Sequence, residues 1–327
     1  MAGDPILTVS QLRVSIRGDE GVAKILDHID FRLAPGRILG VVGESGCGKS
    51  TLIRAILGIL SPGARVEAGG IVFEGRHLLA LSEREMNRTV RGSRIGFIPQ
   101  DPYLALNPVF TVGAQLLEVM RWHATAWPRR EHRDRLLALL RRVQLPDPEA
   151  ALDRYPHQFS GGQRQRLVIA GALASAPSLI VADEPTTALD VTTQGQILVL
   201  LRELVTEFGL SMLFVTHDLG VVAELCDDLS VIYAGQSVET GTTADVLSQP
   251  RHPYTRALLA CHPDRSDGFA GIPGAVPSPL RPPPGCRFAP RCPEARAACP
   301  TRPPHLVTVA PAHAVDCVLY EREDALA

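Results

Sequence analysis

Short apolar runs along the chain predict three buried strands. They cover residues 37–42, 178–182 and 211–215, and each run ends at glycine or polar residues. Mostly apolar runs of this length, bounded by turn residues, are typical of strands that are buried on both faces of a sheet. After the first run, apolar residues recur at helical spacing over residues 51–60. The pattern therefore predicts a strand, a glycine-rich loop and a helix in that order, which is an α/β arrangement.

Two further helices are predicted between the first and second strands. Residues 129–142 place leucines among arginines, which indicates an amphipathic helix whose basic face lies in solvent. Residues 167–174 are apolar and follow a second glycine turn, at residues 159–162, whose free backbone amides can bind an anion. Near residue 250 the composition changes, since 14 of the 27 prolines fall in residues 251–327. We expect this tail to be a separate, loop-rich module.

The composition excludes several classes of protein. With 327 residues, of which 45% are hydrophobic and 21% charged, the chain can form a sizeable core, which excludes a disordered or fibrous protein. The 33 Lys and Arg residues against 35 Asp and Glu residues give a net charge of −2, so we expect no nucleic-acid partner. The N-terminus lacks the basic start of a signal peptide, and no apolar run reaches the roughly 18 residues of a membrane span. We therefore expect a soluble, cytosolic chain.

One of the two lysines lies in a phosphate-binding pattern. Lys24 and Lys49 are the only lysines among the 33 basic residues, and Lys49 completes the pattern G-x-x-x-x-G-K-[ST]. Backbone amides freed by the glycines, together with the start of the following helix, would hold phosphates. Lys49 would contact the terminal phosphates, and the Ser50 hydroxyl would bind Mg²⁺. The candidate nucleotide-binding residues are Gly43, Glu44, Ser45, Gly46, Cys47, Gly48, Lys49, Ser50 and Thr51.

Polar side chains follow the second and third predicted strands. Asp183 and Glu184 come directly after the second strand, and His217 follows the third. Ligands of α/β proteins bind at the rim where such strands end, so Asp183 fits the Mg²⁺-binding acid of a Walker B strand. Glu184 fits a group that orients or deprotonates the attacking water. Alone, the two acids would be interpreted as a solvated turn, but the phosphate loop favours the catalytic interpretation.

The order and spacing of six motifs resemble those of the ATP-binding subunit of ABC transporters. The motifs are the phosphate loop, Gln100, Phe159-Ser160-Gly161-Gly162-Gln163, Asp183-Glu184, Ala188-Leu189-Asp190 and His217. The Ser-Gly-Gly-Gln element distinguishes this family from other phosphate-loop NTPases. The resemblance implies an ATPase with a RecA-like mixed sheet, an antiparallel β edge region and an inserted helical subdomain at about residues 101–176. These would form a nucleotide-binding domain over residues 1–250, followed by the extension of residues 251–327.

The resemblance also implies roles for residues around the reacting phosphate. Gln100 looks like a ligand of the attacking water and of Mg²⁺, which Ser50 and Asp183 would also hold. His217 looks like the histidine that contacts the γ-phosphate, and we expect it to be catalytic together with Glu184.

Members of this family work as head-to-tail dimers, which implies that one chain holds two half-sites. The phosphate loop of one subunit and the Ser160-Gly161-Gly162-Gln163 element of the other would hold one ATP, and Asp190 would contact the opposite subunit. The family stacks an aromatic residue on adenine, but residues 14–17 contain none. Ile16 is the residue expected to pack on the base there.

The tail resembles the C-terminal extension of oligopeptide and dipeptide importer ATPases. The resemblance rests on residues 252–259, on Ile272-Pro273-Gly274 and on residues 285–293, while residues 186–190 look more like the D-type subunit than the F-type subunit. It implies a peptide importer with a related F-type ATPase chain, two transmembrane permease subunits and an extracytoplasmic solute-binding protein. The chain would lie at the cytoplasmic face of the inner membrane, and residues 103–108 would dock the permeases.

Other functions remain open on the residues alone. A soluble ABC ATPase of DNA repair or translation is one alternative, although we find no coiled-coil insertion, second cassette or basic arm in the sequence. An importer of another small solute, such as a metal chelate or glutathione, is a second alternative. The sequence does not identify the solute, which is selected outside this subunit.

Four cysteines in the tail suggest a bound metal. Cys286, Cys292, Cys299 and Cys317 have the spacing C-x5-C-x6-C-x17-C. Four clustered thiolates can close a zinc site or hold a [4Fe–4S] cluster, and a disulfide framework is not expected in the cytosol. The resemblance to peptide importers favours a [4Fe–4S] cluster, whose role would be structural. A redox sensor that gates transport is a rival interpretation of the tail. Zinc and unligated thiols are the alternatives.

Overall fold

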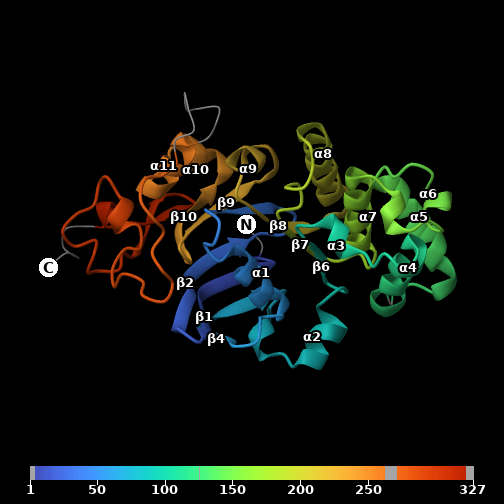
Figure 1. The fold of residues 1–327 in the computed structure, drawn as a ribbon, viewed down its shortest axis with the longest axis horizontal. Coiled ribbons are helices and arrows are strands. Elements are labelled where there is room, and N and C mark those ends of the chain that lie inside the picture. The colour runs from blue at the N-terminus through green and yellow to red at the C-terminus, as the bar shows by residue number, and fades with distance from the viewer. Residues whose placement is uncertain (1–3, 125, 262–270, 322–327) are drawn as a thin grey trace. The chain divides into compact units, whose positions relative to one another are not determined.

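The computed structural model describes residues 4–124, 126–261 and 271–321, and most of its helices and strands are labelled in Figure 1. Its contacts divide the chain into two compact units. The first unit comprises Met1–Ala34, Ile38–Leu79 and Val215–Ala327, and the second comprises Pro35–Arg37 and Ala80–Phe214. The second unit is thus inserted into the sequence of the first. Within the described residues, no helix has the length and hydropathy needed to cross a bilayer.

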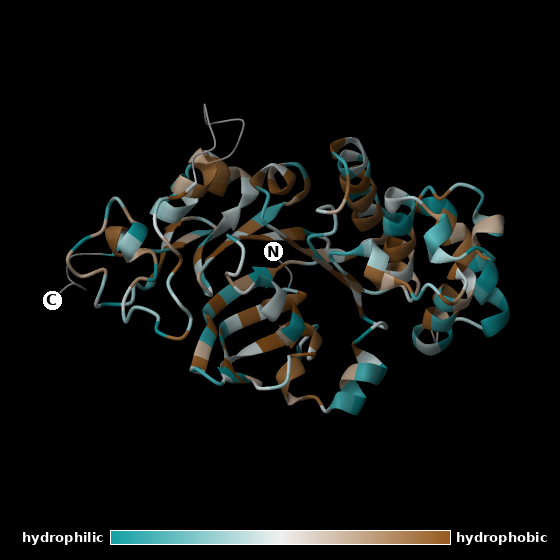
Figure 2. Cartoon of the chain, viewed as in Figure 1, coloured by the Kyte–Doolittle hydropathy of each residue, from teal (hydrophilic) through white to brown (hydrophobic). Residues whose placement is uncertain are grey.

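An antiparallel sheet forms one part of the first unit. Its strand order is β2 (Gly21–Leu33), β1 (Leu7–Gly18), β4 (Ala64–Phe73) and β5 (Arg76–His77). Apolar residues of β1 such as Leu7 are buried, whereas the residues between them are polar. Figure 2 shows this banding across the strands of the sheet. One buried face and one solvated face are typical of antiparallel sheets, and this sheet is the antiparallel region that the family resemblance implied.

A second sheet of the first unit carries the phosphate loop. Its strand order is β11 (Leu306–Ala310), β12 (His313–Asp316), β10 (Gln236–Thr242), β9 (Asp228–Tyr233) and β3 (Ile38–Val42). β3 and β9 are parallel, and the other pairs are antiparallel. Among the residues that the structure describes, the α-helices of this unit are α1 (Lys49–Leu57), α9 (Leu219–Leu225), α10 (Thr243–Ser248) and α11 (Pro253–Ala260). The proline-rich tail supplies β11 and β12, which the hydrophobic pattern did not predict.

The second unit contains three strands and a group of helices. Its strand order is β8 (Ser211–Thr216), β7 (Leu179–Asp183) and β6 (Ile95–Ile98), and the last two residues of β8 belong to the first unit. The helices are α2 (Glu83–Thr89), α3 (Pro102–Ala105), α4 (Val112–His123), α5 (His132–Arg142), α6 (Pro148–Ala151), α7 (Gly161–Leu173) and α8 (Val191–Phe208). The three strands predicted from apolar runs all form.

A buried carboxylate joins the tail to β10. Glu239 has no exposed surface. Its Oε1 accepts a hydrogen bond from the backbone N–H of Arg251 at 2.6 Å and lies 2.8 Å from His313 Nε2, while its Oε2 accepts from the backbone N–H of His252 at 2.9 Å. Because a buried carboxylate is costly unless it is hydrogen-bonded, these partners make Glu239 a fixed junction between β10, α11 and β12.

We expect Glu239→Ala to lower the free energy of unfolding by about 3 kcal/mol, because it leaves buried N–H groups without an acceptor. Glu239→Gln preserves one acceptor oxygen and the side-chain volume, so this matched variant should be destabilised less. Urea denaturation followed by circular dichroism measures both changes. A Glu239→Ala chain as stable as the wild type would show that the junction contributes nothing.

Candidate functional site

The phosphate loop of the first unit has a backbone that requires glycine. It follows the fully buried strand β3 and ends where α1 begins at Lys49. Gly48 has a φ of +102°, in the left-handed region that favours glycine. A Cβ atom on Gly43 would lie 2.1 Å from the carbonyl oxygen of Ile232, so the neighbouring strand β9 leaves no space for a side chain. The local geometry therefore explains both glycines of the motif.

The Lys49 side chain is held inside this loop. It is 6% exposed, and its Nζ donates hydrogen bonds to the carbonyl oxygens of Gly43 at 2.7 Å and Glu44 at 3.2 Å. These acceptors are dipoles rather than full charges, so the ammonium group can still attract an anion. Ser45, Gly46 and Ser50 are exposed at the same loop. The loop thus presents a cation, a hydroxyl and the start of α1 together.

Cys47 and Thr51, the remaining predicted residues of the phosphate loop, add no charge to the loop. Cys47 is buried, and burial raises the pKa of its thiol. A neutral, buried thiol packs as a small apolar side chain. Thr51 is half-buried in the first turn of α1.

In the second unit, Gln100 and Glu184 are brought together at the ends of adjacent strands. β6 and β7 are parallel, with Ile98 opposite Ala182, so the residues that follow them emerge at one edge of the sheet. Gln100 Nε2 donates to Glu184 Oε2 at 3.2 Å, and Thr187 Oγ1 donates to the same oxygen at 3.1 Å.

The backbone of Glu184 is itself unusual. Its φ of +44° lies in the left-handed region, which costs energy for a residue with a side chain and is found disproportionately at functional sites. Asp183, the last residue of β7, is half-buried beside it. The arrangement places two carboxyl groups and an amide at one strand edge.

The Ser160-Gly161-Gly162-Gln163 element forms the start of α7. Ser160 Oγ accepts from the backbone N–H of Gln163 at 3.3 Å, and the Ser160 N–H donates to Gln163 Oε1 at 3.1 Å. This reciprocal capping fixes the first turn of a 13-residue helix, whose remaining amides can bind an anion. A Cβ atom on Gly162 would lie 2.7 Å from Thr193 Cγ2 of α8.

Asp190 caps the start of the neighbouring helix α8. Its two carboxylate oxygens accept from the backbone N–H and the hydroxyl of Thr193, both at 2.9 Å. The hydrogen bond from the Thr193 backbone N–H, and then that from the hydroxyl, lower the pKa of Asp190. The aspartate is therefore held as an exposed anion.

The remaining predicted residues lie in the first unit. His217 is exposed directly after β8, and Ile16 is half-buried near the end of β1. The first unit thus contains Ile16, the phosphate loop and His217, and the second contains Gln100, the Ser160 element, Asp183, Glu184 and Asp190.

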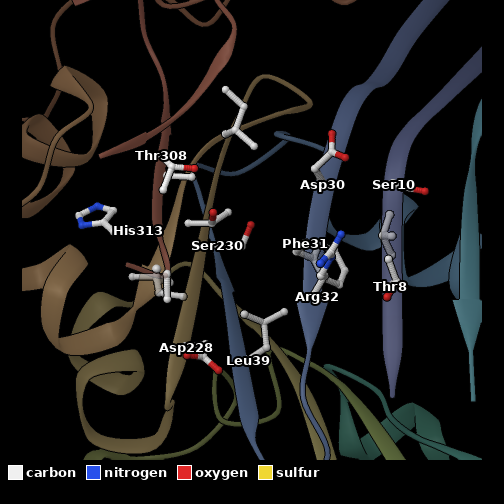
Figure 3. Close-up of a pocket in the computed structure, with 17 residues that line it drawn as sticks. Thr8, Ser10, Asp30, Phe31, Arg32, Leu39, Asp228, Ser230, Thr308 and His313 are labelled. Carbon is white, nitrogen blue, oxygen red and sulfur yellow. The ribbon is translucent and has the colours of Figure 1, made fainter. Parts of the chain in front are cut away.

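The first unit also contains a cavity of about 620 Å³. It is lined by side chains of both sheets, among them Asp30, Arg32, Ser230 and His313 (Figure 3). None of its lining residues is a predicted site residue. This cavity therefore does not coincide with the predicted site residues.

The predicted iron–sulfur cluster is wrong, and so is its zinc alternative. In residues 4–124, 126–261 and 271–321, no group of three or more His, Cys, Asp or Glu side chains could hold a metal ion. Cys286, Cys292, Cys299 and Cys317 line one apolar cavity, but its volume is about 10 Å³, which is the space of about one water.

The four thiols instead pack in an apolar environment. Cys299 and Cys317 are each 8% exposed and lie among residues such as Val318. Burial raises the pKa of Cys286 to about 11 and that of Cys317 to about 12. Thiols in this state behave as small hydrophobic side chains, so the cysteines contribute to the core of the tail.

Sequence reasoning missed two contacts between the tail and the phosphate loop. Arg291 forms an ion pair with Glu44, and the Glu44 backbone N–H donates to Tyr254 Oη at 3.0 Å. The available signal was the acidic side chain of Glu44 in a loop expected to bind phosphate, which requires a nearby cation.

Comparison with known proteins places the chain in a family. Residues 26–187 match the ABC transporter family, and residues 238–299 match the oligopeptide/dipeptide transporter C-terminal region. The chain is 47% identical to the probable peptide ABC transporter ATP-binding protein y4tR of Sinorhizobium fredii, over 96% of this chain and 95% of that protein. It is 44% identical to the dipeptide transport ATP-binding protein DppD of Bacillus subtilis, over 98% and 96% of the two chains.

Solved structures with the same fold include ATP-binding cassettes. The cbiO1 protein of Clostridium perfringens, part of an ABC transporter complex, has a TM-score of 0.65 at 29% identity, covering 76% of this chain and 92% of that one. The cassette MJ0796, solved as a dimer bound to ADP and Pi, has a TM-score of 0.63 at 27% identity, covering 72% and 98%. This chain therefore belongs to the ABC transporter ATP-binding proteins, in the group that has the oligopeptide/dipeptide transporter C-terminal region.

Proposed function

We propose that this chain hydrolyses ATP to energise the import of di- and oligopeptides, as the D-type ATPase subunit of an ABC importer. The observation that supports the peptide assignment most strongly is the match of residues 238–299 to the oligopeptide/dipeptide transporter C-terminal region. That match lies outside the residues that match the ABC transporter family itself. It therefore supports a peptide transporter, among all ABC transporters, independently of the ATP-binding motifs.

The chain's phosphate loop would bind the nucleotide. Lys49 and the amides of the loop attract the β- and γ-phosphates, and Ile16 packs on the adenine. Hydroxyl, amide and carboxylate oxygens are ligands that Mg²⁺ prefers, so Ser50, Gln100 and Asp183 would hold it. When bound, Mg²⁺ neutralises phosphate charge during the transfer.

Hydrolysis would depend on Glu184 and its neighbours. Glu184 accepts a proton from the attacking water as the water oxygen bonds to the γ-phosphorus and the bond to ADP breaks. The hydrogen bond from Gln100 Nε2 orients the carboxylate for this step. His217 contacts the γ-phosphate and stabilises the charge that develops on it.

Two ATPase subunits would share each nucleotide. The amides at the start of α7, in the Ser160 element, would approach the γ-phosphate bound by the opposite subunit, and Asp190 would contact that subunit. ATP binding then closes the dimer and hydrolysis reopens it. We propose a related F-type chain as the second subunit.

An exposed apolar segment would dock the membrane subunits. Tyr103 and Leu104 of α3 are 51% and 84% exposed, and Val109 and Phe110 shortly after it are 72% and 55% exposed. Apolar side chains gathered on a surface mark interaction sites. We propose that they receive the cytoplasmic helices of two permease subunits at the inner membrane, with solute delivered by an extracytoplasmic binding protein.

Peptide-stimulated ATP hydrolysis tests this function. The chain is copurified with the neighbouring encoded subunits, reconstituted in vesicles with the binding protein, and assayed for phosphate release. We expect di- or oligopeptides to raise the hydrolysis rate severalfold over the rate without solute. Stimulation by a metal chelate or by glutathione but by no other peptide would contradict the peptide assignment while leaving the ATPase assignment intact.

A further inference from the structure

Arg291, in the tail, uses all of its hydrogen-bond donors at a buried position. Its side chain is 3% exposed. Nη1 donates to Glu44 Oε2 at 2.8 Å and to Tyr233 Oη at 3.2 Å, and Nη2 donates to Glu44 Oε1 at 3.1 Å. Nη2 also donates to the Ile272 carbonyl at 2.8 Å, and Nε donates to the Pro273 carbonyl at 3.0 Å. A guanidinium has five N–H donors, and five acceptors meet it here.

The surroundings of Arg291 fix its orientation. Tyr233, Tyr254 and Phe288 are each at most 1% exposed and pack on one another, with ring centroids 4.6 to 5.5 Å apart. The adjacent turn at Gly274 has a φ of +84°, and a Cβ atom there would lie 3.0 Å from Arg291 Cγ. The packed aromatic cluster and the tight turn therefore fix the orientation in which the guanidinium contacts Glu44.

Glu44 connects this cluster to the phosphate-binding lysine. Its backbone N–H donates to Tyr254 Oη at 3.0 Å, and its carbonyl accepts from Lys49 Nζ at 3.2 Å and from the Cys47 N–H at 3.2 Å. The tail thus holds Glu44 by its side chain and by its amide, while the Glu44 carbonyl holds Lys49. Displacement of Glu44 would move an acceptor of the lysine.

The ion pair also solves an electrostatic problem. A carboxylate within a loop that binds phosphate repels the ligand, because like charges at short range are unfavourable. The bidentate contact with Arg291 compensates that charge in a fixed geometry. Arg287 and Arg291 lie in the same stretch of the tail and both have 3% exposed side chains, but Arg287 forms its ion pair with Asp27 of β2 at 2.8 Å.

We propose that Arg291 is a positioning residue of the nucleotide site: the C-terminal extension sets the conformation and charge of the phosphate loop through the Arg291–Glu44 ion pair. This inference rests on the proposed function, since the ligand is the nucleotide of that site. The proposal gives the C-terminal extension a role in ATP affinity, although the extension is far from the phosphate loop in the sequence.

Calorimetric titration of the full-length chain with MgADP, which binds without turnover, tests the proposal. We expect Arg291→Ala to raise the Kd about tenfold, in the range of coupling between linked sites. Arg291→Lys, which retains the charge but not the bidentate geometry, should give a smaller increase. In a Glu44→Ala background, Arg291→Ala should change the Kd less than twofold, because the residue through which it acts is absent.

Arg287→Ala is the matched control for a general loosening of the tail, and we expect its Kd to remain within twofold of the wild type. In the assembled transporter, Arg291→Ala should raise the KM for ATP about tenfold with little change in kcat, since ground-state binding is what it affects. The proposal fails if Arg291→Ala binds as the wild type does, if Arg287→Ala weakens binding equally, or if the effect persists without Glu44. Absence of MgADP binding by the wild type would instead contradict the proposed function itself.

Discussion

Glu184→Gln should reduce ATP hydrolysis by at least about 100-fold, because an amide cannot accept the proton of the attacking water. The variant should still bind MgATP, since the phosphate loop is unchanged and glutamine can occupy the position between Gln100 and Thr187. We expect ATP-dependent association with the partner ATPase to persist, because the closed state is no longer lost through hydrolysis. Phosphate release measures the first effect, and sedimentation velocity with and without ATP measures the second.

Glu203→Gln is the matched control for this substitution, because Glu203 is an exposed acid on α8 in the same unit. Its hydrolysis rate should remain within about twofold of the wild type, as is usual for surface substitutions. A Glu184→Gln variant that hydrolyses ATP at the full rate would refute the catalytic role of Glu184.

Lys49→Met should weaken MgATP binding about 100-fold, because it removes the buried charge that we propose contacts the phosphates while preserving most of the side-chain volume. The sequence provides its own control, since Lys24 is the other lysine and lies exposed on β2. Lys24→Met should bind MgATP as the wild type does. Equilibrium dialysis against MgATP gives both affinities. Equal binding by the two variants would show that Lys49 does not contribute to nucleotide binding.

Local sequence patterns were sufficient for the phosphate loop and the strand ends. β3, the glycine loop and α1 are consecutive, so hydrophobic periodicity and glycine spacing determine them directly. Glu184 was predicted as a strand-end residue, whereas Gln100 was identified only through the family resemblance, and the parallel pairing of β6 and β7 brings the two together. Parallel neighbours expose their carboxyl ends at one edge, which is why separate motifs converge.

Contacts that join distant parts of the chain were not predictable from such patterns. Arg291 is 247 residues from Glu44 in sequence, and no periodicity connects the two. β11 and β12 are short strands in a proline-rich segment, and tertiary pairing with β10 determines them rather than intrinsic preference.

The cysteine spacing led to the wrong prediction of a metal site for a related reason. Spacing along the chain indicates that Cys286 and Cys317 can approach each other, but it does not give the volume or polarity of the space between them. In the folded tail that space is about 10 Å³ and lined by apolar groups. The buried contacts of Glu239, Arg287 and Arg291 hold the tail to the rest of the first unit.

Calorimetric titration of MgATP into the Glu184→Gln chain, in complex with its companion subunits, tests the central claim most directly. In this variant the nucleotide is not consumed, so the heat reports binding alone. We predict saturable binding of one MgATP per phosphate loop, and adding Lys49→Met should weaken the binding at this chain's own loop about 100-fold. A well-folded complex that takes up no MgATP would contradict the assignment of this chain as the ATP-binding subunit.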